Sequence, residues 1–174
     1  ENILGDITFG PDLNKIEDNL LFNQGIYEID KIIVIDDGSK DATYKILSSL
    51  AKTMPLLVPV TKKNSGHGAT ILHGYKYAIE QGADYIFQTD SDGQTLPSEF
   101  HDFYKQREKY DMIIGWRNKR EDGSSRVFVT KVLKAVIKLC FKVDVQDANT
   151  PFRLMKTETL KQYIDLIPND FNLS

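Results

Sequence analysis

The stretch YIFQTDSDGQ, residues 85–94, decides how the rest of the chain is interpreted. Its first part carries the β-branched and aromatic side chains typical of a strand. It ends in Asp90 and Asp92, two residues apart, and Gly93 allows a sharp turn. Two carboxylates just past a buried strand are costly unless a cation lies between them. Mg²⁺ or Mn²⁺ would fit, because these ions take carboxylate oxygens and leave positions for phosphates. A solvated turn that contains two aspartates is the alternative.

Composition places the chain among single globular domains. Its 174 residues can bury one core, and the hydrophobic and charged fractions of 41% and 27% are ordinary. The formal net charge of -3 lacks the basic excess typical of nucleic-acid binding, so we expect no nucleic-acid partner. Cys140 is the only cysteine, which excludes an internal disulfide and agrees with a cytoplasmic protein. We expect one domain over residues 1–174, truncated at both ends.

Strand-like and helix-like patterns alternate on both sides of the opening stretch. The β-branched run at residues 31–35 predicts a central parallel strand, and Pro59 predicts that the strand at 56–60 lies at a sheet edge. Helical spacing of apolar residues and shorter β-type runs predict the remaining elements. Helices are expected near 13–25, 43–52, 69–81, 127–141 and 157–167 and from Pro97, and strands at 111–115 and 152–155. This order predicts an α/β domain with a mostly parallel sheet.

Polar residues follow three of the predicted strands at the point where each strand ends. Asp36 and Asp37 follow one strand, the Asp-x-Asp turn another, and Arg117 a third. In such sheets, ligands bind outside the carboxyl ends of the strands. Carboxylates would hold an anionic substrate through a metal ion, and Arg117 and Lys63 could hold its phosphate oxygens. This combination suits a nucleoside diphosphate. For the Asp36–Asp37 pair, a helix N-terminal cap is equally open.

Two further features carry candidate roles. Asp147 lies in the loop before Phe152-Arg153, where it could deprotonate an acceptor hydroxyl or simply form a turn, and the sequence leaves both open. The predicted helix at 127–141 carries lysines on one face, which indicates either a solvated face or contact with anionic lipid headgroups. These lysines are Lys131, Lys134 and Lys138.

Four motifs in order resemble those of family 2 glycosyltransferases, which have the GT-A fold. They are IVIDDGS at 33–39, NSGHG at 64–68, DSDGQ at 90–94, and Asp147 ahead of Phe152-Arg153. The resemblance covers roughly residues 31–167. The chain most resembles the polyprenyl-phosphate glycosyltransferase branch, which includes dolichol-phosphate mannose synthase.

The resemblance implies a Rossmann-like three-layer domain and an inverting, metal-dependent sugar transfer. The donor would be a nucleoside-diphosphate sugar and the acceptor a polyprenyl phosphate or a glycan, with possible peripheral contact at the cytoplasmic face of a membrane. It implies that Asp90 and Asp92 hold Mg²⁺ or Mn²⁺ and that Asp147 is the catalytic residue. The donor-binding residues it implies are Asp36, Asp37, Ser39, Lys63, Gly66, Asp90, Arg117 and Arg126.

The chain also departs from the family pattern. The opening strand and its nucleobase motif are missing, so we expect a sheet without its first strand. His67 stands where many members have lysine. The alternatives are a non-catalytic protein that binds nucleotide sugars and, with less support, a phosphoacceptor receiver module. The second acid of the Asp-x-Asp turn and the basic loop after Gly115 argue against the receiver module. A sugar nucleotidyltransferase would need a glycine-rich, Arg-Lys-containing loop after its first strand, which this sequence does not show.

Overall fold

The computed structural model describes residues 3–8, 29–90, 99–115 and 150–168. Within these ranges, six strands form one sheet in the order β3-β2-β1-β4-β6-β5. The first four strands in this order run parallel, and β6 is antiparallel to both of its neighbours. The strands are β1 Ile3–Thr8, β2 Ile29–Asp36, β3 Leu57–Thr61, β4 Tyr85–Asp90, β5 Met112–Ile114 and β6 Arg153–Lys156. The predicted α/β domain with a mostly parallel sheet is confirmed.

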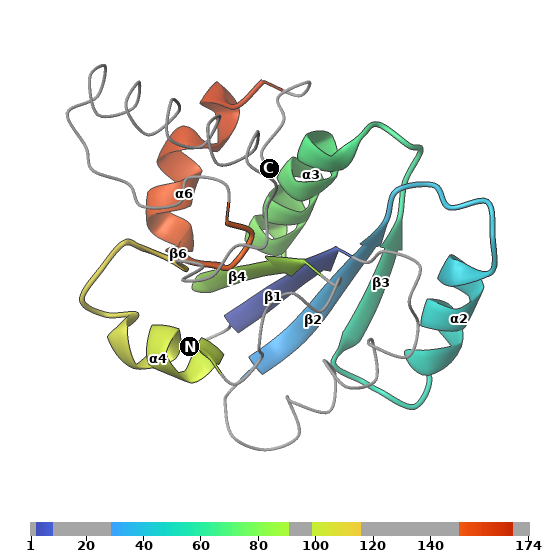
Figure 1. Ribbon diagram of the computed structural model, residues 1–174, viewed down its shortest axis with the longest axis horizontal. Helices are drawn as coiled ribbons and strands as arrows, with labels where there is room; N and C mark the ends of the chain where they lie inside the picture. Colours follow the sequence, from blue (N-terminus) through green and yellow to red (C-terminus); the bar gives the residue numbers. More distant parts are fainter. Residues whose placement is uncertain (1–2, 9–28, 91–98, 116–149, 169–174) are drawn as a thin grey trace, which may run out of the picture.

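Helices cover both faces of the sheet and make a three-layer arrangement (Figure 1). On one face lie α3 and α6, and on the other lie α2 and α4. Their bounds are α2 Thr43–Leu50, α3 His67–Glu80, α4 Phe100–Gln106 and α6 Thr157–Tyr163. The helix predicted at 157–167 is shorter than expected, because α6 gives way to the 3-10 turn η2 (Ile164–Leu166). In the described part of the chain, no helix is long and apolar enough to cross a membrane.

The β-branched run of β2 supplies the centre of both cores. Successive side chains of a strand point to opposite faces, so Ile33 joins the α3 side while Val34 packs with Leu47 of α2. Both β2 residues have 0% exposure. A strand covered on both faces needs no alternation of polar residues, which explains the continuous apolar run.

A third cluster of buried side chains lies between α4, β4 and β6. The ring of Phe87 packs 4.6 Å from that of Phe100 and 4.7 Å from that of Phe152, measured between centroids. Such tilted and edge-to-face contacts are the favourable geometries of aromatic pairs. The Phe100 side chain is buried.

The expectation that the sheet lacks its first strand is wrong. β1 occupies the centre of the sheet, where it pairs with β2 from Leu4↔Lys31 to Thr8↔Ile35 and with β4 from Ile3↔Tyr85 onward. The sequence ILGDIT has no apolar run and contains Gly5, so local pattern did not indicate a strand here. Backbone pairing on both sides overrides this weak propensity.

The remaining predictions concern the strand that contains Pro59 and three segments of the chain. The edge position inferred from Pro59 is confirmed, because β3 is the first strand of the sheet. The helices predicted near 13–25 and 127–141 and the basic loop at 116–126 lie outside the described residues.

Candidate functional site

The carboxyl ends of the parallel strands meet along one edge of the sheet. Asp36 pairs with Thr61 at the end of β3, while Thr8 at the end of β1 lies between Ile35 and Asp90. Asp36 and Asp90 therefore flank the end of β1, two strand spacings or about 10 Å apart. Acidic residues from separate parts of the chain converge here, as the order of the elements predicts.

Asp36 is 5% exposed and joins the turn after β2 to the end of β3. Its Oδ1 accepts a hydrogen bond from the Ser39 N–H at 3.1 Å, and its Oδ2 accepts one from the Thr61 hydroxyl at 3.0 Å. Each carboxylate oxygen has a second lone pair, so these contacts orient the group without exhausting its capacity. Ser39, a predicted donor contact, thus belongs to the same turn.

At the start of α2, the acid that accepts hydrogen bonds is Asp41, and not the Asp36–Asp37 pair. Its Oδ1 accepts hydrogen bonds from the Thr43 backbone N–H at 2.9 Å and from the Thr43 hydroxyl at 2.5 Å. The hydrogen bond from the Thr43 side chain, followed by the one from its N–H, lowers the pKa of the Asp41 carboxyl. The alternative in which the acid pair caps this helix is therefore wrong.

Asp37 holds the loop between β3 and α3. Its Oδ1 accepts from Lys62 Nζ and from the Ser65 N–H at 3.0 Å, and its Oδ2 accepts from the Gly66 N–H at 3.0 Å. Burial raises the pKa of the Asp37 carboxyl, but hydrogen bonds from Lys62, Ser65 and Thr70 outweigh burial, and the pKa lies below its ordinary value. The carboxyl is accordingly held in its charged form.

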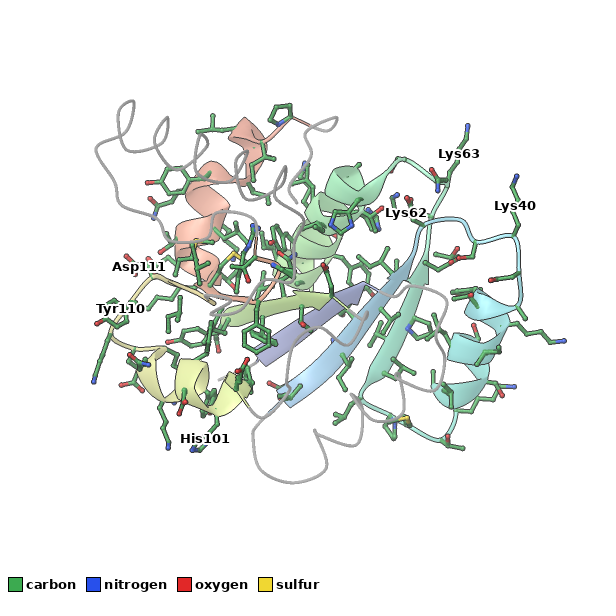
Figure 2. All side chains as sticks on the ribbon, in the orientation of Figure 1. Lys40, Lys62, Lys63, His101, Tyr110 and Asp111 are labelled. Carbon is green, nitrogen blue, oxygen red and sulfur yellow. The ribbon has the colours of Figure 1, made fainter. Side chains whose placement is uncertain are left out.

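The structure separates the two neighbouring lysines of this loop. Lys62 is half-buried beside the beginning of α3, whereas the side chain of Lys63 points outward, away from the sheet (Figure 2). The sequence predicts a phosphate contact at Lys63 and assigns no role to Lys62, whereas Lys62 is the lysine that contacts Asp37. Lys62 directly follows the last residue of β3, where its N–H donates to the Asp36 carbonyl oxygen at 3.1 Å and continues the sheet pairing.

Asp90 ends β4, and its Oδ1 atom is buried. A carboxylate at a strand end is the hard oxygen donor that Mg²⁺ and Mn²⁺ prefer, so the residue fits the predicted metal site. Among the described residues, no group of three or more His, Cys, Asp or Glu side chains is placed to hold a metal ion. Of the predicted pair, only Asp90 lies in the described chain, and Asp92 lies in the segment 91–98, outside it.

The remaining predicted site residues, Arg117, Arg126 and Asp147, also lie outside the described residues. The described residues that flank their segment are at the same sheet edge. The Gly115 N–H donates to the Phe152 carbonyl oxygen at 2.8 Å, next to the pairing of Ile114 with Arg153. Because Arg153 also pairs with Gln88 of β4, this junction lies near Asp90.

A buried polar pair beneath the edge was not predicted. The Tyr75 hydroxyl of α3 donates to Gln88 Oε1 of β4, and both residues are at most 2% exposed. Gln88 Nε2 is buried and finds no acceptor in the part of the chain that the structure describes. Gln88 lies two residues before Asp90 and on the same face of β4, so the pair supports the strand end that carries this acid.

The sequence is similar to those of known glycosyltransferases. A family model described as Glycosyl transferase family 2 matches residues 19–164. The chain is 28% identical over 132 residues to the UDP-N-acetylglucosamine--dolichyl-phosphate N-acetylglucosaminyltransferase of Methanococcus voltae, covering 67% of the chain and 53% of that relative. It is 28% identical over 120 residues to an undecaprenyl-phosphate 4-deoxy-4-formamido-L-arabinose transferase of Pseudomonas fluorescens, covering 67% and 34%. The chain spans about half, or less, of the length of these relatives.

Solved structures share the fold. One is a mannosyltransferase from Pyrobaculum calidifontis in complex with GDP-Man and Mn²⁺, similar with a TM-score of 0.64 at 18% identity over 97% of this chain and 48% of that chain. The family model extends from before β2 to the end of α6 and includes both acidic motifs and Asp147. The chain therefore belongs to glycosyl transferase family 2.

Proposed function

We propose that this chain is the catalytic domain of a metal-dependent, inverting glycosyltransferase. Its donor is a nucleoside-diphosphate sugar, and its acceptor is a polyprenyl phosphate or a glycan. The observation that carries the proposal is that Asp36 and Asp90 end the two strands that flank β1, with Asp37 directly after Asp36. Two relatives are named as transferases acting on dolichyl phosphate and undecaprenyl phosphate, and one similar structure holds GDP-Man and Mn²⁺.

Different residues along this edge would contact the nucleoside, the metal ion and the phosphates of the donor. Asp36, oriented by Ser39 and Thr61, has lone pairs left to accept from a nucleobase N–H or a ribose hydroxyl. Asp90 and Asp92 would hold Mg²⁺ or Mn²⁺, which when bound neutralises the diphosphate as it leaves. The other predicted donor contacts are Lys63, Gly66, Arg117 and Arg126, whose roles follow from the family pattern.

Asp147 is the proposed catalytic residue on the acceptor side. With a hydroxyl acceptor, its carboxylate would take the proton as the oxygen attacks the sugar. A polyprenyl phosphate is already ionised near neutral pH, so with that acceptor Asp147 only has to orient it. We accordingly expect Asp147→Asn to abolish transfer to a hydroxyl acceptor while leaving nucleotide affinity within about twofold of wild type, a change below ~0.5 kcal/mol.

Calorimetric titration tests the donor side. Wild-type protein is titrated with a panel of nucleoside diphosphates, with and without Mn²⁺, and the titration is repeated with Asp92→Ala. We expect binding that requires Mn²⁺ and that is lost in Asp92→Ala. Metal-independent binding, or binding that survives Asp92→Ala unchanged, contradicts the metal role. Metal-dependent binding without transfer to any acceptor would instead indicate a non-catalytic protein that binds nucleotide sugars.

Transfer to a lipid-linked acceptor would take place at the cytoplasmic face of a membrane. Lys131, Lys134 and Lys138 repeat at helical spacing and would meet anionic headgroups. We expect co-sedimentation with vesicles of anionic lipid that weakens with salt and with replacement of these lysines by glutamine. Co-sedimentation that responds to neither change assigns the three lysines to an ordinary solvated face.

A further inference from the structure

We infer that Lys62 is a positioning residue that joins the turn after β2 and the loop before α3 into one preformed edge of the donor site. This inference rests on the proposed function, because it concerns the edge at which the nucleotide would bind. Lys62 itself is not placed in contact with substrate. It acts through Asp37 and through the backbone of residues 65–66.

The hydrogen bonds of Lys62 converge on this junction. Its Nζ atom donates to Asp37 Oδ1, to Ser65 Oγ at 2.5 Å and to Thr70 Oγ1 at 3.1 Å, with the Lys63 carbonyl oxygen farther away at 3.3 Å. An ammonium group has three hydrogens, so these partners use its full donor capacity. The side chain is only 15% exposed, which strengthens each contact relative to one in bulk water.

The partners of Lys62 belong to three different segments. Asp37 follows β2, Ser65 precedes α3, and Thr70 lies in the first turn of α3, where its hydroxyl donates to the Gly66 carbonyl oxygen at 2.9 Å. Asp37 in turn receives the N–H groups of Ser65 and Gly66. The result is a closed network in which each segment is hydrogen-bonded to at least two others.

Close backbone contact makes the same two loops interdependent. A Cβ atom at Gly38 would lie 2.8 Å from the Asn64 backbone nitrogen and 3.1 Å from the Lys62 carbonyl oxygen. Gly38 stands between Asp37 and Ser39, whose N–H orients Asp36. A shift of the loop at residues 62–66 would therefore move the turn that aims Asp36, even though Lys62 is not itself a proposed nucleotide contact.

Removing the charge of Lys62 while keeping its length tests this inference. We would compare wild type with Lys62→Met, Lys62→Arg and, as a matched control, Lys40→Met. Lys40 is exposed, lies in the neighbouring turn and points outward in Figure 2. In Lys62→Met, we expect the Kd for a nucleoside diphosphate with Mn²⁺ to rise on the order of tenfold or more, with partial recovery in Lys62→Arg and no change in Lys40→Met.

A second measurement does not depend on any ligand. Carbon NMR titration follows the Asp37 carboxyl, and hydrogen exchange follows the amides of Ser65 and Gly66. In Lys62→Met, we expect a higher pKa for Asp37 and faster exchange of both amides, while amides in the middle of β2 stay protected and show that the fold persists. Lys40→Met should match wild type in both measurements.

The two measurements separate failure of the inference from failure of the proposed function. If wild type binds no nucleoside diphosphate, the proposed function fails, and the NMR and exchange data alone decide whether Lys62 holds the loop. If wild type binds and Lys62→Met binds equally well, the inference is overturned while the proposed function stands. Unchanged exchange of the Ser65 and Gly66 amides in Lys62→Met overturns it in either case.

Discussion

Gly38 is the residue at which backbone conformation and close packing act together. Its φ of +73° lies in the left-handed region, and its missing side chain leaves room for the backbone of Asn64. Gly82, after α3, has a similar φ of +79° but has nothing within 4 Å of where a Cβ would lie. The two glycines therefore separate the cost of a strained φ from the cost of a steric clash.

Alanine substitution at these two glycines should give unequal losses of stability. Gly82→Ala carries only the left-handed backbone penalty and should lower the free energy of unfolding by about 1 kcal/mol. Gly38→Ala adds overlap with a backbone atom that cannot rotate away, so we expect a loss of about 2–4 kcal/mol. Denaturant unfolding of both variants beside wild type measures the difference. Equal losses would show that the contact with Asn64 relaxes at no cost.

Asp37 should make stability depend on acid pH. Its pKa is lowered in the folded chain, so the unfolded chain binds more protons near and below the ordinary carboxyl value of about 3.9. The stabilisation is complete above that pH and is lost as pH falls through the folded pKa. We expect the free energy of unfolding of wild type to drop more steeply below about pH 4 than that of Asp37→Asn. Parallel curves would mean that Asp37 gains nothing from Lys62 and the loop amides.

The contact between α3 and β4 includes the buried Tyr75–Gln88 hydrogen bond. Tyr75→Phe would leave the Gln88 amide without this partner inside the core, and we expect a loss of about 1–3 kcal/mol. Gln88→Met should cost a similar amount by removing the Gln88 Oε1 acceptor of the Tyr75 hydroxyl. The double variant removes both polar groups, so its loss should be smaller than the sum of the single losses by about 0.5–3 kcal/mol. Strict additivity in denaturant unfolding would show that the two side chains are energetically independent.

Elements with a strong local pattern were predictable from the sequence. The apolar run of β2, the helical spacing in α3 and the proline in β3 each determine their own structure, and all three were placed correctly. β1 was not predictable, because its six residues have little strand pattern and owe their conformation to neighbours from distant parts of the chain. Propensity describes a segment alone, while pairing depends on the assembled sheet.

The same distinction applies to the candidate site. Asp36 and Asp90 could be placed at one edge because each lies at the end of a parallel strand, and parallel strands end at the same edge of a sheet. The choice of Lys62 over Lys63 depends on which side chain turns back toward Asp37, and adjacent residues of a loop carry no period that could indicate this. Similarly, the Gln88–Tyr75 contact joins a strand to a helix, and only the packing of α3 on the sheet creates it.

At the scale of the whole molecule, the proposed donor site lies across strands that come from different parts of the chain. A ligand bound there would stabilise the assembled sheet and not the unfolded chain. We expect a nucleoside diphosphate at about 100 times its Kd to add roughly 2.7 kcal/mol to the free energy of unfolding, seen as a higher Tm, only when Mn²⁺ is present. Asp90→Asn should lose this shift. A shift of equal size without metal would contradict the role assigned to the Asp-x-Asp turn.

The central position of β1 has a consequence for how the chain folds. β2 and β4 do not pair with each other, since each pairs with β1 across a register that begins near Ile3. During synthesis, β1 must wait until residues 85–90 have emerged before its second side is covered. Such non-local pairing is slow to form and leaves a sheet edge open in the meantime. Nascent chains that stop before β4 should therefore be more prone to aggregate and to bind chaperones than chains that include it.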